Sequence, residues 1–277
     1  IAHPKVKRIN FTGSTRVGKI IAGEAAKYLK PVLLELGGKA PLVILDDADI
    51  EGAVNAAAFG AFMNQGQICM STEKIVVDDK VADEFVKRFG AKAGALPYGD
   101  PTGHVVLGSV VDRATVEKVD ALIEDAVAKG AVVVTGGATN STIMPATVVD
   151  RVTPDMRIYK EEIFGPVLSV VRAKDYEEGL ALASDHEYGN GVAIFTRDGD
   201  AARDFTARVN VGMVGVNVPI PVPLAYYTFG GWKRSGFGDL NQHGPDSVRF
   251  YTKTKTVTSR WPSGIKDGAE FVIPTMR

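Results

Sequence analysis

Two residues of the chain have side chains whose types suit covalent catalysis. Cys69 is the only cysteine, so it has no partner within the chain for a disulfide, and it follows Gly66 and Gln67 rather than an apolar run. Glu35 lies inside the apolar stretch 31–36, where burial makes a carboxylate costly unless it has a role. A thiol nucleophile and a carboxylate base together would support thiohemiacetal chemistry.

Both residues also have plainer interpretations. A lone cysteine is more often an inert, buried, small side chain than a nucleophile. Glu35 could instead be a strand-end carboxylate that pairs with Lys39. If Cys69 does catalyse, we expect a lowered thiol pKa and fast alkylation, because the thiolate is the reactive form.

Two further segments could bind a ligand. Residues 11–18 place Gly13 and Ser14 between a predicted strand and a predicted helix, where backbone N–H groups and a hydroxyl can bind phosphate. Because Thr15 occupies the second glycine position, the full dinucleotide fingerprint is absent, and a plain tight turn is equally consistent. Residues 161–166 set two glutamates before an aromatic residue, and a loop leading into the next strand would explain them as well.

Composition and charge narrow the class of protein. The 277 residues are 45% hydrophobic and 23% charged, which is typical of a globular chain with one large domain or two smaller ones. A net charge of −1 predicts neither nucleic acid nor an anionic membrane as partner. One cysteine, no apolar membrane span and no leader predict a cytoplasmic protein. We predict no metal site, since metal-ligand spacing is absent among His3, His104, His186 and His243.

Two hydrophobic periodicities alternate along the chain and predict the elements that must position these residues. Strands are predicted at 6–11, 31–36, 41–45, 75–77, 132–135, 147–149, 167–171 and 192–195. Helices are predicted at 17–29, 49–63, 81–95, 113–129, 176–184 and 200–209. This alternation predicts an α/β fold with a mostly parallel sheet. Residues 230–238 read as a glycine-rich loop, and residues 252–260 alternate like a terminal strand with one wet face.

Five motifs together resemble the aldehyde dehydrogenase superfamily. They are residues 13–18, 35–39, 66–69, 162–166 and 229–233, in the family's order and spacing, and the resemblance covers essentially the whole chain. It implies that Cys69 is the nucleophile and Glu35 the general base for deacylation. The cofactor-binding residues that it implies are Gly13, Ser14 at the pyrophosphate, Leu36, Glu162 at the nicotinamide ribose, and Phe164 beside the nicotinamide ring. The substrate-pocket residues that it implies are Ile68, Met70 and Phe229, with Lys39 helping to shape the site.

The two halves of the chain resemble different branches of that superfamily. Residues 1 to about 155 are similar to bacterial salicylaldehyde, vanillin and benzaldehyde dehydrogenases, notably over 64–74. From about 158 onward the chain is similar to bacterial methylmalonate-semialdehyde dehydrogenase, notably over 239–244 and 259–264. Family members normally carry a long N-terminal portion with most of the cofactor-binding sheet and the oxyanion asparagine. A chain that starts at Ile1 is therefore expected to be N-terminally truncated.

The resemblance also implies a domain organisation and a reaction. A remnant of the Rossmann-type NAD(P)-binding domain is expected at 1–36, an aldehyde-dehydrogenase-like catalytic domain at 37–235, and a return helix with an oligomerisation strand at 236–277. The implied reaction is oxidation of an aromatic aldehyde or a semialdehyde to a carboxylic acid with NAD or NADP. The glutamate at position 35 favours water over CoA as acyl acceptor. A homo-oligomer is expected, because an unpaired terminal strand would leave a bare edge.

Two alternatives to this reaction stay open. A cofactor-independent thiol esterase needs only Cys69, Glu35 and an oxyanion donor such as the Cys69 amide. A catalytically silent fragment would follow if the expected cofactor domain is largely missing.

Overall fold

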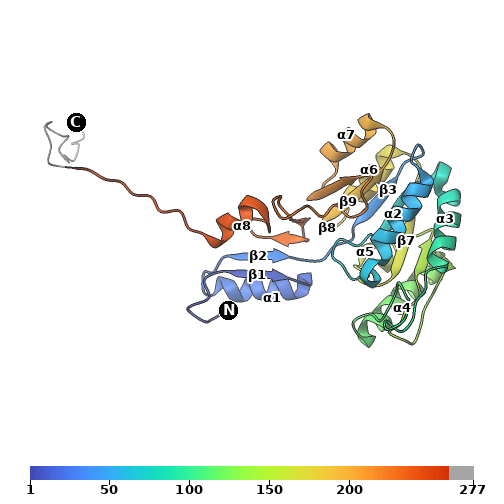
Figure 1. The fold of residues 1–277 in the computed structure, drawn as a ribbon, viewed down its shortest axis with the longest axis horizontal. Helices are drawn as coiled ribbons and strands as arrows, with labels where there is room; N and C mark the ends of the chain where they lie inside the picture. Colours follow the sequence, from blue (N-terminus) through green and yellow to red (C-terminus); the bar gives the residue numbers. More distant parts are fainter. Residues whose placement is uncertain (262–277) are drawn as a thin grey trace.

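Two lobes of unequal size make up the fold in the computed structural model, which describes residues 1–261 (Figure 1). The smaller lobe contains both the first strands of the chain and its last helix. The larger lobe holds the residues between them, and the chain crosses from one lobe to the other after Glu35 and returns at about Gly236. The site predicted from the sequence depends on segments at this crossing.

The smaller lobe is a strand–helix–strand unit with a third short strand. β1 (Ile9–Thr12) and β2 (Val32–Glu35) are parallel, and α1 (Thr15–Ala26) connects them. β12 (Gly236–Phe237) pairs antiparallel with β2, and α8 (Gly244–Tyr251) follows it. The register sets Thr12 opposite Glu35, so β1 and β2 end at the same level.

A seven-stranded sheet forms the centre of the larger lobe. Its strand order is β10 (Met213–Val216), β9 (Gly191–Phe195), β3 (Pro41–Ile44), β4 (Lys74–Asp78), β7 (Val167–Ala173), β6 (Thr147–Asp150) and β5 (Val132–Thr135). All neighbours are parallel except β5, which pairs antiparallel with β6. Every residue of β3 and β4 is buried, as expected of central strands covered on both faces.

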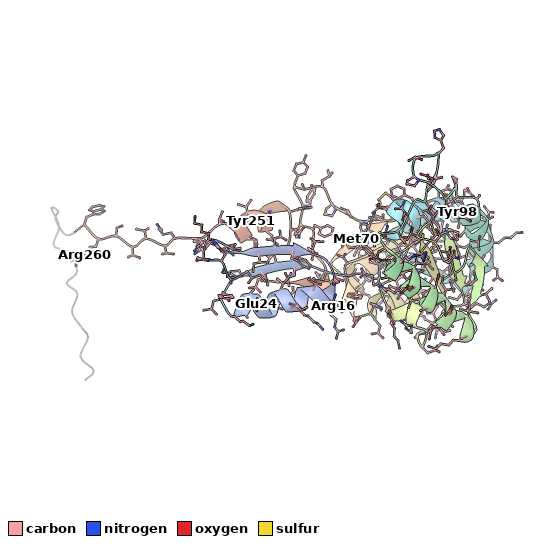
Figure 2. All side chains as sticks on the ribbon, turned by 90° about the horizontal axis from the view of Figure 1, so that it is seen from below. Arg16, Glu24, Met70, Tyr98, Tyr251 and Arg260 are labelled. Carbon is pink, nitrogen blue, oxygen red and sulfur yellow. The ribbon has the colours of Figure 1, made fainter. Side chains whose placement is uncertain are left out.

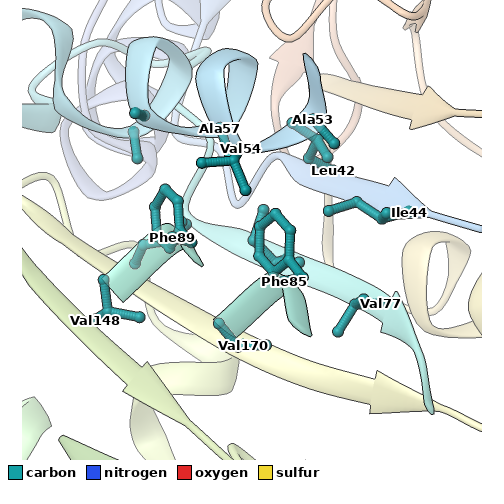
Figure 3. Close-up of a cluster of buried hydrophobic side chains, with 14 of the residues drawn as sticks. Leu42, Ile44, Ala53, Val54, Ala57, Val77, Phe85, Phe89, Val148 and Val170 are labelled. Carbon is teal, nitrogen blue, oxygen red and sulfur yellow. The ribbon is translucent and has the colours of Figure 1, made fainter. Parts of the chain in front are cut away.

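Helices cover both faces of this sheet. α2 (Ile50–Phe62) and α3 (Asp79–Gly94) pack on one face, where Phe85 and Phe89 stack between the helices and the strands (Figure 3). The other face is covered by α4 (Arg113–Ala128), α5 (Arg157–Lys160), α6 (Tyr176–Ser184) and α7 (Gly199–Arg208). Successive strand residues point to opposite faces of the sheet. Leu42 therefore packs in the hydrophobic cluster under α2 and α3, and Val43 packs in the cluster under α6 and α7.

The fold class predicted from the sequence is confirmed: the chain is α/β with a mostly parallel sheet. The predicted return helix corresponds to α8. The predicted terminal strand differs, because residues 252–261 are exposed and join none of the sheets in the described part of the chain. A strand exists only when a neighbour pairs with its backbone, and residues 1–261 offer no such neighbour here. The remainder of the predicted oligomerisation segment, 262–277, lies outside the described residues.

Four strands were not predicted. They are β10, β12, and the strands β8 (Tyr188–Gly189) and β11 (Trp232–Lys233), which form a two-stranded sheet. Within residues 1–261, none of the helices combines the length and the apolar character needed to cross a membrane.

Candidate active site

Glu35 and Cys69 come from opposite sides of the crossing between the lobes. Glu35 is the last residue of β2, and Cys69 lies in the loop between α2 and β4. The crossing is held by Ser235: its carbonyl accepts the Leu36 N–H at 2.9 Å, and its hydroxyl donates to the Gly37 carbonyl at 2.7 Å. Figure 2 shows Met70, the neighbour of Cys69, where the lobes meet, and Arg16 near the end of α1 that faces this junction.

The loop that carries Cys69 has an unusual backbone. Asn64 and Gln65 adopt left-handed φ values of 51° and 56°, and Gly66 follows at 67°. The Cys69 carbonyl accepts a hydrogen bond from Asn190 Nδ2 at 3.2 Å, and a Cβ at Gly38 would lie only 2.5 Å from the same oxygen. Gly38 is therefore required for the close approach of this loop to the turn after β2.

The Cys69 thiol is half-buried, and its pKa differs in direction from the prediction. Burial raises the pKa of the thiol, a hydrogen bond from Asn190 lowers it by less, and the charge of Glu35 raises it further. The expected lowered pKa is thus wrong for this structure, because loss of hydration outweighs the hydrogen bonds that lower the thiol pKa. The charge of Glu35 therefore acts electrostatically on the Cys69 thiol.

Glu35 is almost completely buried, with 3% of its surface exposed. Burial raises its pKa from 4.5 to about 7, and a backbone hydrogen bond from Gly231 opposes the rise. Within the described residues, Oε2 is buried and has no hydrogen-bond partner. The plainer interpretation of Glu35 as a partner of Lys39 is wrong, since the Lys39 ammonium pairs with Glu73 at 3.0 Å. A carboxyl that titrates near pH 7 suits a general base.

A cleft of about 540 Å³ runs from the first turn of α1 to Cys69. It brings together all five residues predicted to bind the cofactor with the predicted nucleophile. The lining residues are Thr12, Gly13, Ser14, Leu36, Gly37, Gln67, Cys69, Thr115, Lys118, Glu162, Ile163 and Phe164. Segments far apart in the sequence therefore form one concave surface.

Glu162 is fixed at the cleft by the turn after β2. Its Oε1 accepts the Gly38 N–H at 2.9 Å, and a Cβ at Gly37 would lie 2.9 Å from its Oε2. Burial raises the pKa of Glu162, and the charge of Glu73 raises it further. Two residues later, Phe164 has a left-handed φ of 56°, which a residue other than glycine rarely adopts.

The chemistry of the lining fits a dinucleotide. Ser14 caps α1 by accepting the Val17 N–H, and the free N–H groups of this helix end favour an anion such as pyrophosphate. Leu36, Ile163 and Phe164 supply apolar side chains to the lining, which suits a flat ring.

Three residues predicted for the substrate pocket are not among the residues that line this cleft. Ile68 is half-buried beside Cys69. Met70 is completely buried against Gly191, where a Cβ would lie 2.2 Å from its terminal methyl group. Phe229 is half-buried, packs beside His243, and pairs through its backbone with Gln242. Their roles as substrate contacts stay predictions.

The sequence reasoning missed two buried polar residues at the site, Asn190 and Glu73. Asn190 is 2% exposed and joins β8 to β9, and Glu73 is 3% exposed directly before β4. The signal that identified Glu35, a carboxylate inside an apolar stretch, is absent at both, because Asn190 lies between two glycines and Glu73 lies between Thr72 and Lys74. In the part of the chain that the structure describes, no group of three or more His, Cys, Asp or Glu residues could hold a metal ion.

Comparison with known proteins identifies the family. The model of the aldehyde dehydrogenase family matches residues 1–257. Vanillin dehydrogenase of Pseudomonas fluorescens is 51% identical over 93% of this chain and 53% of its own length. Malonate-semialdehyde dehydrogenase of Pseudomonas aeruginosa is 46% identical over 99% of this chain and 57% of its own.

A solved structure from Sinorhizobium meliloti, complexed with NAD, superposes with a TM-score of 0.91 at 48% identity, covering 96% of this chain and 56% of the other. The chain thus spans about half the length of the relatives it matches. On these matches, the chain belongs to the aldehyde dehydrogenase family.

Proposed function

We propose that this chain carries the active-site half of an enzyme that oxidises an aldehyde to a carboxylic acid with a nicotinamide dinucleotide. One observation supports this most strongly: a buried carboxyl with a pKa of about 7 lies within electrostatic reach of a thiol that lines a cleft. A structural carboxylate would be paired, whereas Glu35 Oε2 has no partner within residues 1–261. Because Oε2 has no hydrogen-bond partner there and the pKa of the carboxyl is about 7, Glu35 can accept a proton at neutral pH.

Cys69 performs the covalent steps in this proposal. Its thiol gives its proton to solvent, and the thiolate sulfur adds to the aldehyde carbon to give the oxyanion of a thiohemiacetal. The backbone N–H of Cys69 is the candidate donor for the oxygen that gains charge. Loss of the hydride from this carbon would leave a thioester on Cys69, and an oxidised nicotinamide would supply the hydride acceptor when bound.

Glu35 performs the hydrolytic step. It takes a proton from a water molecule as that water attacks the thioester carbon, the carbon–sulfur bond breaks, and the acid departs. Its buried position keeps the carboxyl poised, because a pKa of about 7 leaves a large share of the base form at neutral pH. The presence of this base supports water rather than CoA as the acyl acceptor.

The cofactor would be held by residues that already line the cleft. Gly13 and Ser14 would bind the pyrophosphate at the start of α1, and Glu162 would accept hydrogen bonds from the ribose hydroxyls. Leu36 and Phe164 would flank the nicotinamide. The S. meliloti relative that was solved with NAD supports this choice of cofactor class.

The substrate is an aldehyde, either aromatic or a semialdehyde, because the relatives are named for vanillin and for malonate semialdehyde. We also propose a homo-oligomer in which residues 252–261 pair as a strand with another subunit, since they join none of the sheets within residues 1–261. Sedimentation of a strict monomer, with this segment sensitive to protease, would contradict the oligomer.

A second candidate activity is a thiol esterase. It is favoured by the fact that Cys69 and Glu35, the two groups that acyl transfer needs, both lie on this chain and require no cofactor.

The deciding experiment measures two reactions of the purified chain side by side. NAD(P)H formation is followed with vanillin and with a short semialdehyde, and hydrolysis of p-nitrophenyl acetate is followed without nucleotide, each with Cys69→Ser as control. Aldehyde-dependent NAD(P)H formation that is lost in Cys69→Ser supports the dehydrogenase. Ester hydrolysis without any NAD(P)H formation selects the esterase. If neither reaction exceeds the rate of the Cys69→Ser variant, both activities are rejected.

A further inference from the structure

We propose that Glu73 is a positioning residue for the cleft, which holds the 162–164 loop against the turn at Gly37–Lys39 so that Glu162 and Phe164 face a bound nucleotide. The inference rests on the proposed function, because it assigns Glu73 to the nucleotide-binding side of that site. Glu73 itself is not among the residues that line the cleft.

The carboxylate of Glu73 joins two segments that are distant in sequence. Its Oε2 accepts the Lys39 Nζ at 3.0 Å and the Ile163 N–H at 2.7 Å, and its Oε1 accepts the Phe164 N–H at 2.8 Å. Three donors thus converge on one buried side chain. Charge-assisted hydrogen bonds of this kind are about twice as strong as neutral ones.

The backbone of Glu73 is equally well anchored. Its N–H donates to the Ala40 carbonyl at 3.1 Å, and its carbonyl accepts the Ser169 hydroxyl at 2.8 Å. These bonds tie Glu73 to the start of β3 on one side and to β7 on the other. The carboxylate is therefore a fixed point of the central sheet rather than a mobile surface group.

The loop that Glu73 holds needs such a fixed point. Phe164 has a left-handed φ of 56°, and the N–H groups of Ile163 and Phe164 both point at the Glu73 carboxylate. Glu162, one residue before, accepts the Gly38 N–H at 2.9 Å. The loop is thus held at three consecutive residues, and two of the three bonds end on Glu73.

Only a carboxylate satisfies all three donors. A glutamine would keep one acceptor oxygen, but its NH2 group would face either the Phe164 N–H or both the Lys39 ammonium and the Ile163 N–H. The Lys39 side chain is fully buried, and burial lowers its pKa while the Glu73 charge raises it. Loss of Glu73 therefore releases the loop and also leaves a buried ammonium without its counter-ion.

The experiment measures how well a nucleotide protects Cys69 from alkylation, a readout that needs no turnover. The iodoacetamide rate is recorded against NAD+ concentration for wild type, Glu73→Gln and the double variant Lys39→Leu/Glu73→Leu. Asp150→Asn is the matched control, since Asp150 is also a buried carboxylate of this sheet, paired with Arg172 at 2.8 Å, away from the cleft. Thermal midpoints are measured on the same samples.

We expect NAD+ to protect wild type and Asp150→Asn at the same concentration, and Glu73→Gln to need about tenfold more, as for loss of charged hydrogen bonds. The double variant should regain thermal stability over Glu73→Gln without regaining protection, since the buried charge is gone but the loop N–H groups still lack an acceptor.

Equal protection of Glu73→Gln and wild type would overturn the inference, as would protection that returns with stability in the double variant. If Glu73→Gln does not fold, the double variant alone decides: protection by NAD+ at the wild-type concentration would overturn the inference, and weaker protection would support it. Failure of NAD+ to protect wild type would instead contradict the proposed function.

Discussion

Two buried carboxyls lie at strand ends beside the same cleft, and they differ in what surrounds them. Glu35 ends β2 with one backbone donor and an oxygen that has no partner within residues 1–261, and burial raises its pKa to about 7. Glu73 precedes β4 with three donors on its two oxygens. Equal burial therefore gives opposite chemistry: the poorly satisfied carboxyl is suited to move a proton, and the fully satisfied one to hold structure.

Both carboxyls bear on catalysis only if Cys69 is the nucleophile of this site. Cys69→Ala should reduce ester hydrolysis and aldehyde oxidation by at least about 10³-fold, because the covalent intermediate cannot form. The check is steady-state assay of both reactions, with circular dichroism to confirm the fold. Retention of either reaction would remove Cys69 from the mechanism.

Removal of the Glu73 charge should have a large effect on the stability of the fold. Glu73→Gln should lower the free energy of unfolding at neutral pH by about 3 kcal/mol, since removing one partner of a buried ion pair strands the other. Urea denaturation at pH 7 measures it. Asp150→Asn should cost less, because Arg172 keeps Asp83 as a second partner at 2.8 Å. A smaller loss in free energy of unfolding for Glu73→Gln than for Asp150→Asn would contradict a structural role for Glu73.

Glu35 should show a stability effect of opposite sign. Its folded-state pKa of about 7 lies above the ordinary 4.5, so the folded protein keeps the proton to higher pH than the unfolded chain. Between these two values the free energy of unfolding should fall as pH rises, by at most about 3 kcal/mol. Glu35→Gln lacks this titration.

Urea denaturation at pH 4.5 and at pH 8 tests this sign. From pH 4.5 to pH 8, the free energy of unfolding of Glu35→Gln should increase relative to that of wild type. A relative stability that stays constant or falls would show that Glu35 is not a raised-pKa carboxyl.

The smallest expected effect is at Asn190. Asn190→Leu removes the hydrogen bond that lowers the pKa of the Cys69 thiol, so the midpoint of the alkylation rate against pH should move upward and the rate at pH 8 should fall a few-fold. The cost in stability should be modest, since Asn190 Oδ1 is already buried without a partner in the described part of the chain. An unchanged or lowered midpoint would mean that Asn190 does not act on the thiol.

The sequence predicted the fold where periodicity is long enough to recognise. α4 repeats its apolar residues at three- and four-residue spacing, and β4 and β7 are short, mostly apolar runs, whereas β8, β11 and β12 have two residues each and carry no readable pattern. The terminal segment looked like a strand because alternation signals capacity for pairing. Whether a partner is present cannot be read from one chain.

The site was partly predictable for a similar reason. Glu35 stood out because its residue type conflicts with its apolar neighbours Leu34 and Leu36, whereas Glu73 lies between Thr72 and Lys74 and offered no such conflict. Its pairing with Lys39 joins residues 34 apart, which meet only because β3 and β4 are neighbours in the sheet. The direction of the Cys69 pKa was mispredicted because it depends on burial, which residue types near the thiol do not reveal.

The central claim, that Glu35 is the base for hydrolysis of a Cys69 thioester, is tested most directly by rapid mixing of Glu35→Gln with NAD+ and vanillin. We predict a burst of NADH close to one equivalent per site, as in wild type, followed by steady turnover that is about 10²-fold or more slower. Unchanged steady turnover in Glu35→Gln, or loss of the burst itself, would contradict this role for Glu35.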